Sequence, residues 1–106
     1  MTFEKINIQE FPYQGKFQRV QSGRYEDIIT VLLECQVDIQ LTNAAMGLVA
    51  QTADYAIYFK NEGVLIKKED TFIGERNGET IKGQVKNIEQ SQLNRMTAFI
   101  KREEFN

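Results

Sequence analysis

The sequence predicts an all-β protein, a small antiparallel β-barrel or sandwich of six to eight short strands. Three observations lead to this fold class. Apolar and polar residues alternate without a break between positions 33 and 41, residues that favour turns recur about every ten positions, and no stretch has the apolar periodicity of a long amphipathic helix. Short strands separated by regularly spaced turns are typical of small barrels and sandwiches.

The strongest strand signal lies within residues 28–41. From Leu33 to Leu41 every second residue is apolar, and the residues between them are polar. Because successive side chains of a strand point to opposite faces of a sheet, this pattern gives the strand one buried face and one solvent-facing face. We expect the later strands of the chain to pair around it.

Residues 24–33 are compatible with two structures. Ser22 could cap a short helix whose first turn holds Glu26 and Asp27. However, the β-branched residues at positions 28–31 lose side-chain freedom in a helix and pack well in a sheet. We therefore favour a strand here and keep a short helix as the alternative.

The chain before this strand holds two weaker strand signals. Apolar alternation predicts a short strand over residues 3–8 and another over residues 16–21. Residues 11–15 interrupt the pattern, because Pro12 has no amide proton for a sheet and Gly15 favours a turn.

The second half of the chain supplies the remaining strands. The sequence predicts them at residues 55–60, 71–75, 79–88 and 95–101. The Asn77-Gly78 pair between two of them is a strong hairpin signal, since both residues tolerate positive φ. Gly83 within a strand suggests a bulge or a bend. The polar residues 89–94 are expected to form a connection.

The segment from Thr42 to Asp54 differs from its surroundings. It is rich in small residues and uncharged until Asp54. A short strand over residues 47–51 is conceivable, but the character is that of a long excursion between strands. Long loops in compact domains are usually functional or disordered, and this one is too apolar for simple disorder.

The composition indicates one soluble domain that spans residues 1–106. Thirteen basic residues against fifteen acidic ones give a net charge of −2, which provides no electrostatic reason for nucleic acid or an anionic membrane as a default partner. We find no apolar run of membrane-spanning length and no apolar signal segment at the N-terminus. The expected location is the cytoplasm, with no membrane partner.

The residues for catalysis or metal binding are scarce. The chain has no histidine, which excludes Ser-His-Asp catalysis and imidazole metal sites. Its single cysteine, Cys35, lies in the apolar register of a strand and is expected to pack as a small hydrophobic residue. The adjacent pairs Glu26-Asp27 and Glu69-Asp70 point to opposite sides of an extended chain, so we expect them to be solvated. We expect no enzyme, no catalytic or metal site and no cofactor.

One basic stripe permits an alternative function. Lys82, Gln84 and Lys86 line one side of a predicted strand, and Tyr58 and Lys60 share a face of another. Barrels that bind single-stranded nucleic acid combine basic and aromatic side chains in this way. A small cytoplasmic β-barrel that binds a protein or a single-stranded nucleic acid is therefore the alternative. A lysine-bearing outer face is also common on soluble barrels.

The order of these features resembles a known family. They are an early extended run, a Cys-Gln-Val-Asp-Ile-Gln strand (35–40), the loop 42–54, Ala-Asp-Tyr-Ala-Ile-Tyr-Phe (53–59), Ile-Lys-Lys-Glu-Asp-Thr-Phe (66–72), an Asn-Gly hairpin and a closing strand that ends near Lys101. This order is similar to that of the head-completion or head–tail stopper proteins, the small β-barrels at the head–tail junction of tailed bacteriophages. The resemblance covers about residues 28–103 and rests on strand order.

The resemblance implies a structural role in a connector ring of a phage or prophage. In that family a ring of barrels lies below the portal and adaptor, and a loop between two strands lines or closes the DNA channel. Its implied partners are portal, adaptor and tail proteins or further copies of the chain, with DNA as channel content, in the host cytoplasm and then the virion. By position, Met46, Gly47, Leu48 and Val49 are the candidate channel or partner loop. The alternative is that this loop packs on the barrel.

Overall fold

The structure is a computed structural model, and it describes residues 10–92 and 94–103. The side chains of Ala44, Val49 and Gln92 are not described, and the strand predicted over residues 3–8 lies outside the described residues. The described elements are β1 (Tyr13–Ser22), β2 (Asp27–Leu41), the 3-10 turns η1 (Ala44–Met46) and η2 (Leu48–Thr52), β3 (Tyr55–Lys60), β4 (Thr71–Arg76), β5 (Glu79–Gln92) and β6 (Arg95–Arg102).

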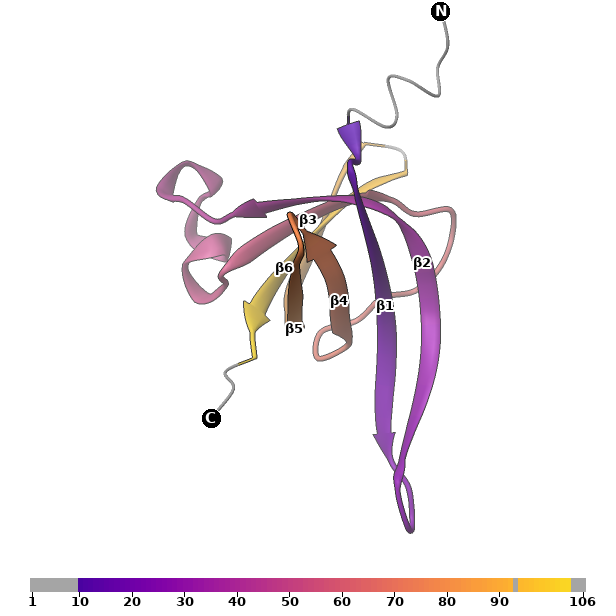
Figure 1. Ribbon diagram of the computed structural model, residues 1–106. Helices are drawn as coiled ribbons and strands as arrows, with labels where there is room; N and C mark the ends of the chain where they lie inside the picture. The colour runs from indigo at the N-terminus through magenta and orange to yellow at the C-terminus, as the bar shows by residue number, and fades with distance from the viewer. Residues whose placement is uncertain (1–9, 93, 104–106) are drawn as a thin grey trace, which may run out of the picture.

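The six described strands form a closed antiparallel barrel in the order β1-β2-β3-β6-β5-β4 (Figure 1). The predicted all-β barrel is therefore confirmed. The alternative helix over residues 24–33 is wrong, because β2 already begins at Asp27 and pairs with β1 from that residue onward. The preference of β-branched side chains for a sheet explains why residues 28–31 form a strand.

The alternation in the second half of β2 produces its two faces. Val37 and Ile39 are 0% and 1% exposed, whereas Gln36 and Gln40 on either side of them are exposed and Asp38 between them is half-buried. Cys35 is half-buried and packs against the core, as its register predicts. Leu41, the last residue of the pattern, is exposed because the strand ends there.

Three phenyl rings fill the middle of the barrel. The ring centroid of Phe17 lies 4.6 Å from that of Phe59 and 5.1 Å from that of Phe72, and all three side chains are buried. Tilted rings at these separations attract each other in addition to the apolar area they bury. Aliphatic side chains from β2, β3, β5 and β6 complete this core.

Two glycines on neighbouring strands make room for one of these rings. Gly15 on β1 pairs with Gly74 on β4, and a Cβ built on either would lie within 2.7 Å of the Phe72 ring. The ring therefore occupies the space that two side chains would otherwise fill. The prediction that residues 11–15 interrupt the sheet is wrong for Tyr13–Gly15, which belong to β1, because Gly15 serves this contact and not a turn.

Replacing Gly74 by alanine is expected to lower the free energy of unfolding by about 1–3 kcal/mol, since the new methyl group overlaps a buried ring. Chemical denaturation measures this change. In a Gly74→Ala/Phe72→Leu double variant the smaller side chain removes the overlap, so the two costs should be less than additive. Strictly additive costs would show that the ring is not what excludes the methyl group.

The β4–β5 hairpin turns at Asn77-Gly78, as predicted, with φ angles of 53° and 82°. Gly83 does not mark a bulge. A Cβ there would lie 2.4 Å from the carbonyl oxygen of Lys101, so glycine permits a close backbone contact with β6. The register shifts lie further along β5, after Val85 and after Gln90. The polar connection predicted over 89–94 is wrong for residues 89–92, because β5 continues to Gln92 and pairs with β6, which begins at Arg95.

The excursion between β2 and β3 contains two 3-10 turns, and the short strand considered over residues 47–51 is not formed. Its base is closed by the Thr42 amide, which donates to the Asp54 carbonyl at 3.1 Å. Ala50 and Ala53 pack with Ala56 and Phe99 in a second, smaller apolar cluster. Part of the excursion thus covers the outside of the β3–β6 pair.

Candidate functional site

The β1–β2 hairpin extends well beyond the barrel (Figure 1). On one side, β1 pairs with β4 only from Gly15 to Gln18, and on the other side β2 pairs with β3 only from Val37. Residues 19–31, which we call the arm, are therefore a two-stranded ribbon. The arm contributes to the elongated dimensions of the described chain, 52 × 30 × 29 Å.

A tight loop closes the arm. The last paired residues are Ser22 and Asp27. A Cβ on Gly23 would lie 2.2 Å from the carbonyl oxygen of Glu26, so this sharp reversal requires glycine. Beyond it, the Arg24 guanidinium lies 5.6 Å from the centroid of the Tyr25 ring. The loop thus presents an aromatic ring and a positive charge together at the tip of the arm.

The arm carries most of the large apolar side chains that the described part of the chain exposes. Five of eight belong to it: Val20 (44% exposed), Tyr25 (90%), Ile28 (55%), Ile29 (58%) and Val31 (48%). Ile28 and Ile29 are consecutive strand residues, so they lie on opposite faces of the ribbon. Val20 pairs with Ile29 across the strands and shares its face. Both faces of the arm are therefore apolar and exposed to solvent.

An isolated two-stranded ribbon is marginally stable in water, and exposed apolar patches on soluble proteins commonly mark binding surfaces. Each Å² of apolar surface removed from water is worth about 25 cal/mol. Because the barrel does not cover the arm, the exposed part of these apolar side chains gains none of this stabilisation within one chain. The arm is consequently the best candidate for a surface that a partner covers.

The arm also offers an unpaired sheet edge. From Asp27 to Gln36, β2 has no strand partner on the side away from β1 within the described residues. Residues 28–33 of this edge contain no charge and no proline, the devices that usually protect an edge strand. Such an edge can accept a further strand from another chain.

A partly buried ion pair, in which Asp70 is buried and Arg19 is half-buried, holds the root of the arm. The Arg19 guanidinium donates to both carboxylate oxygens of Asp70, at 2.8 and 2.9 Å, and the Lys67 amide donates to the same carboxylate at 2.7 Å. The prediction that Glu69-Asp70 is a solvated pair is therefore wrong for Asp70, which is 3% exposed, while Glu69 is exposed. The Val85 amide donates to the Asp70 carbonyl at 2.8 Å and ties this turn to β5.

The same contacts set the ionisation of Asp70. Burial alone would raise the pKa of its carboxyl group, but the hydrogen bonds from Arg19 and from the Lys67 amide, together with the positive charges of both residues, outweigh it and lower the pKa below the usual value. Asp70 is therefore ionised at neutral pH. Its ion pair with Arg19 fixes the point at which the arm leaves the barrel.

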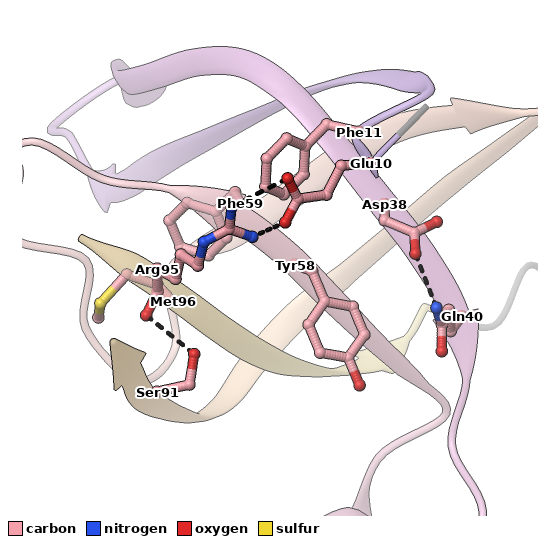
Figure 2. A pocket seen from close by; sticks show the side chains of 9 residues that line it. All are labelled: Glu10, Phe11, Asp38, Gln40, Tyr58, Phe59, Ser91, Arg95 and Met96. Atoms are coloured by element: carbon pink, nitrogen blue, oxygen red, sulfur yellow. Dashed lines mark hydrogen bonds and ion pairs between the residues drawn. The ribbon is translucent and has the colours of Figure 1, made fainter. Parts of the chain in front are cut away.

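A pocket of about 250 Å³ lies near the start of β1 (Figure 2). Its lining residues are Glu10, Phe11, Asp38, Gln40, Tyr58, Phe59, Ser91, Arg95 and Met96. We call it the Tyr58 pocket. Figure 2 shows Asp38 and Gln40 on one side of the Tyr58 ring and Arg95 with Glu10 on the other.

The charged groups of the Tyr58 pocket differ in their partners. Arg95 forms an ion pair with Glu10, with one of its hydrogen bonds at 2.9 Å. Asp38 accepts a hydrogen bond from the Gln40 side-chain amide at 2.7 Å and has no cationic partner among the described residues. One wall of the pocket thus carries a negative charge that no cation of the described chain balances.

The structure places the predicted loop residues on different surfaces. Met46 is half-buried and packs against the cluster around Phe99, whereas Gly47 and Leu48 are exposed, Leu48 by 79%. Gly47 has a φ of 87°, a conformation that favours glycine. The side chain of Val49 is not described. Part of the loop therefore packs on the barrel, and Leu48 is exposed to solvent.

The lysine stripe of the alternative interpretation is partly neutralised. Lys82 lies 3.6 Å from the Glu103 carboxylate, and the Lys86 ammonium group donates to the Gln84 side chain at 2.9 Å. Tyr58 lies on β3 and lines the Tyr58 pocket, whereas Lys82, Gln84 and Lys86 lie on β5 and do not line it. The predicted basic stripe and the predicted aromatic residue therefore do not line one pocket.

Burial raises the pKa of the Cys35 thiol to about 11. At pH 8 the thiolate fraction is therefore small, and we expect modification by a thiol reagent to be slower than that of a free cysteine by on the order of a hundredfold. Spectrophotometric thiol titration of the native and the denatured protein measures the ratio. Equal rates in the two states would contradict the burial of Cys35.

Within residues 10–92 and 94–103 there is no group of three or more potential metal-binding side chains. No helix in that part of the chain is long and apolar enough to cross a membrane. Comparisons with protein-family models, with curated proteins and with solved structures found no match.

Proposed function

We propose that this chain is a non-enzymatic structural subunit of a protein assembly, and that other subunits bind to its arm. The observation that carries this proposal is the exposure of Ile28 and Ile29 on opposite faces of the arm. Interfaces of permanent assemblies resemble a protein core cut in half, and these side chains are of the kind found in cores. An exposed edge on β2 adds a second means of association.

The assembly we propose is the head–tail junction of a tailed phage or prophage, in which the chain is a connector ring subunit. Its partners are portal, adaptor or tail proteins and further copies of itself. The order of sequence features supports this choice, and a small barrel with a projecting hairpin is compatible with it. The net charge of −2 suits a subunit that surrounds DNA without binding it tightly.

The loop 46–49 keeps its proposed place in this assembly. Gly47 and Leu48 are exposed and uncharged, as a segment that faces a channel or a neighbouring subunit requires. Met46 anchors the loop on the barrel through the Phe99 cluster. This arrangement is compatible both with a loop that packs on the barrel and with a loop that faces a channel or a partner.

A pull-down of the tagged full-length chain from its source cells tests the proposal. We expect mass spectrometry to identify portal, adaptor or tail proteins with the unmodified chain. An Ile28→Thr/Ile29→Thr variant makes both faces of the arm more polar and keeps β-branched residues in the strand. We expect it to recover these proteins about tenfold less. A Leu65→Thr variant is the control, since Leu65 is 67% exposed outside the arm.

Other results would decide against the proposal. Equal recovery of the same proteins by the arm variant would mean that the arm is not the binding surface. Recovery of single-stranded nucleic acid that disappears in a Lys82→Glu/Lys86→Glu variant and at high salt would support the alternative binding module. The absorbance of the recovered material separates these outcomes from protein capture.

A further inference from the structure

We infer that the tip of the arm inserts into the Tyr58 pocket of a second copy of this chain, so that copies join head to tail. This inference rests on the proposed function and identifies the contact by which copies associate. It depends on three properties of the chain, which are the chemistry of the tip, the chemistry of the pocket and the distance between them.

The tip carries the side chains that most often dominate protein interfaces. Tyr25 is 90% exposed, and the Arg24 guanidinium lies over its ring. Tyrosine and arginine are enriched among the residues that contribute most to binding, where an aromatic ring fills a pocket on the partner. The Tyr25 ring is apolar and its hydroxyl group is polar, so it suits a pocket with mixed walls.

The Tyr58 pocket has complementary properties. Its volume of about 250 Å³ is below the usual range for small-molecule sites and suits a single large side chain. Phe11 and Tyr58 supply aromatic walls. Asp38 supplies the negative charge without a cationic partner among the described residues, and Arg24 of an incoming tip would supply that cation.

The arm of one molecule cannot fill its own pocket. Phe11 lines the pocket two residues before β1 begins, and the tip follows the end of that ten-residue strand. At about 3.3 Å per residue, the strand separates the two features by roughly 30 Å. The distance measured along β2 is similar, because the pocket residue Asp38 lies eleven positions beyond Asp27, the first residue of that strand next to the tip. The contact therefore requires a second molecule.

Because the tip and the pocket are different surfaces, their contact is heterologous. Such contacts produce closed rings or open chains, and not two-fold dimers. A single side chain in a pocket buries less area than a standard interface, so one contact is expected to be weak. Ring closure then adds stability because each copy makes two contacts.

The test uses two full-length variants and sedimentation over a range of concentrations. Arg24→Asp/Tyr25→Ser removes the tip and keeps the pocket, whereas Asp38→Arg blocks the pocket and keeps the tip. We expect the unmodified chain to form oligomers as concentration rises, and each variant alone to need about thirtyfold higher concentration. A mixture of the two variants retains one intact contact and should give a one-to-one dimer.

A charge exchange provides the second test. Arg24→Asp combined with Asp38→Arg in one chain restores opposite charges across the contact, so assembly should recover toward that of the unmodified chain. The control is Leu65→Ser, which removes an exposed apolar side chain elsewhere and should assemble normally. Circular dichroism checks that each variant keeps the barrel.

The possible failures have different meanings. If the unmodified chain stays monomeric while Ile28→Thr/Ile29→Thr still lowers partner capture about tenfold, the inference is overturned and the proposed function stands. If Asp38→Arg lowers that capture as well, the pocket binds another protein and the inference is likewise overturned. If oligomers form but the variants assemble equally well, or their mixture gives no dimer, the contact lies elsewhere and the inference is again overturned.

Discussion

Replacing Arg19 by methionine is expected to lower the free energy of unfolding by clearly more than the replacement of an exposed arginine on the same hairpin. The change leaves the Asp70 carboxylate buried with the Lys67 amide but without its guanidinium partner. Removing one member of a buried ion pair is costly because the remaining charge has lost its compensation. Chemical denaturation followed by circular dichroism measures the loss.

Two further variants separate this effect from a loss of side-chain volume. Arg24→Met changes an exposed arginine on the same hairpin and should alter the free energy of unfolding by less than about 0.5 kcal/mol. Arg19→Met/Asp70→Leu removes both charges, and apolar replacements of a buried pair are often close to neutral, so much of the stability should return. A double variant as unstable as Arg19→Met would contradict the account of the pair.

The pair also predicts a pH dependence. The lowered pKa of Asp70 means that its contribution to stability is present above the ordinary aspartate pKa of about 3.9 and is lost as the pH falls through the lower pKa of the folded state. In Arg19→Met that contribution is absent. The difference in unfolding free energy between the two proteins should therefore be constant near neutral pH and narrow below about pH 4.

Replacing Phe99 by alanine is expected to cost about 3–4 kcal/mol and to loosen the excursion between β2 and β3. Phe99 is 3% exposed and packs against Ala50, Ala53 and Ala56. Removing a buried phenylalanine loses the free energy gained by transferring its ring out of water, and it also leaves a cavity. Denaturation measures the first effect, and digestion with a protease that cuts at apolar residues measures the second.

The cleavage pattern distinguishes local from global loosening. In Phe99→Ala we expect cuts within residues 43–52 before the barrel is degraded, because this segment loses its main contact. Tyr25→Ala is the control, since that ring is 90% exposed and contributes little to the fold. Unchanged protection of residues 43–52 in Phe99→Ala would mean that the Phe99 cluster does not hold the excursion.

The strands were predictable where local pattern decides them. The alternation from Leu33 to Leu41 and the Asn77-Gly78 turn depend on neighbouring residues, and both predictions are confirmed. The extent of the strands was less predictable. Residues 89–92 are polar, yet they pair with β6, because backbone pairing in an outer part of a sheet does not require apolar side chains.

The site depends on contacts between distant residues, which the sequence does not display. Arg19 and Asp70 are 51 positions apart, so the local pattern around Asp70 suggested only a solvated carboxylate pair with Glu69. The run from Ile28 to Val31 was correctly interpreted as a strand. Its exposure follows from where the neighbouring strands stop pairing, since β3 pairs with β2 only from Val37 and β4 pairs with β1 only up to Gln18. The sequence signal for this exposed surface was that consecutive residues before Leu33, such as Ile28 and Ile29, are apolar, so that both faces of the strand are apolar there.

The central claim is that a partner covers the arm, and hydrogen–deuterium exchange tests it most directly. The measurement compares the free protein with the assembly purified from its source cells. We expect amides of residues 20–31 to exchange at least about tenfold more slowly in the assembly, while those around Leu65 change little. Equal exchange of residues 20–31 in both states would contradict the account.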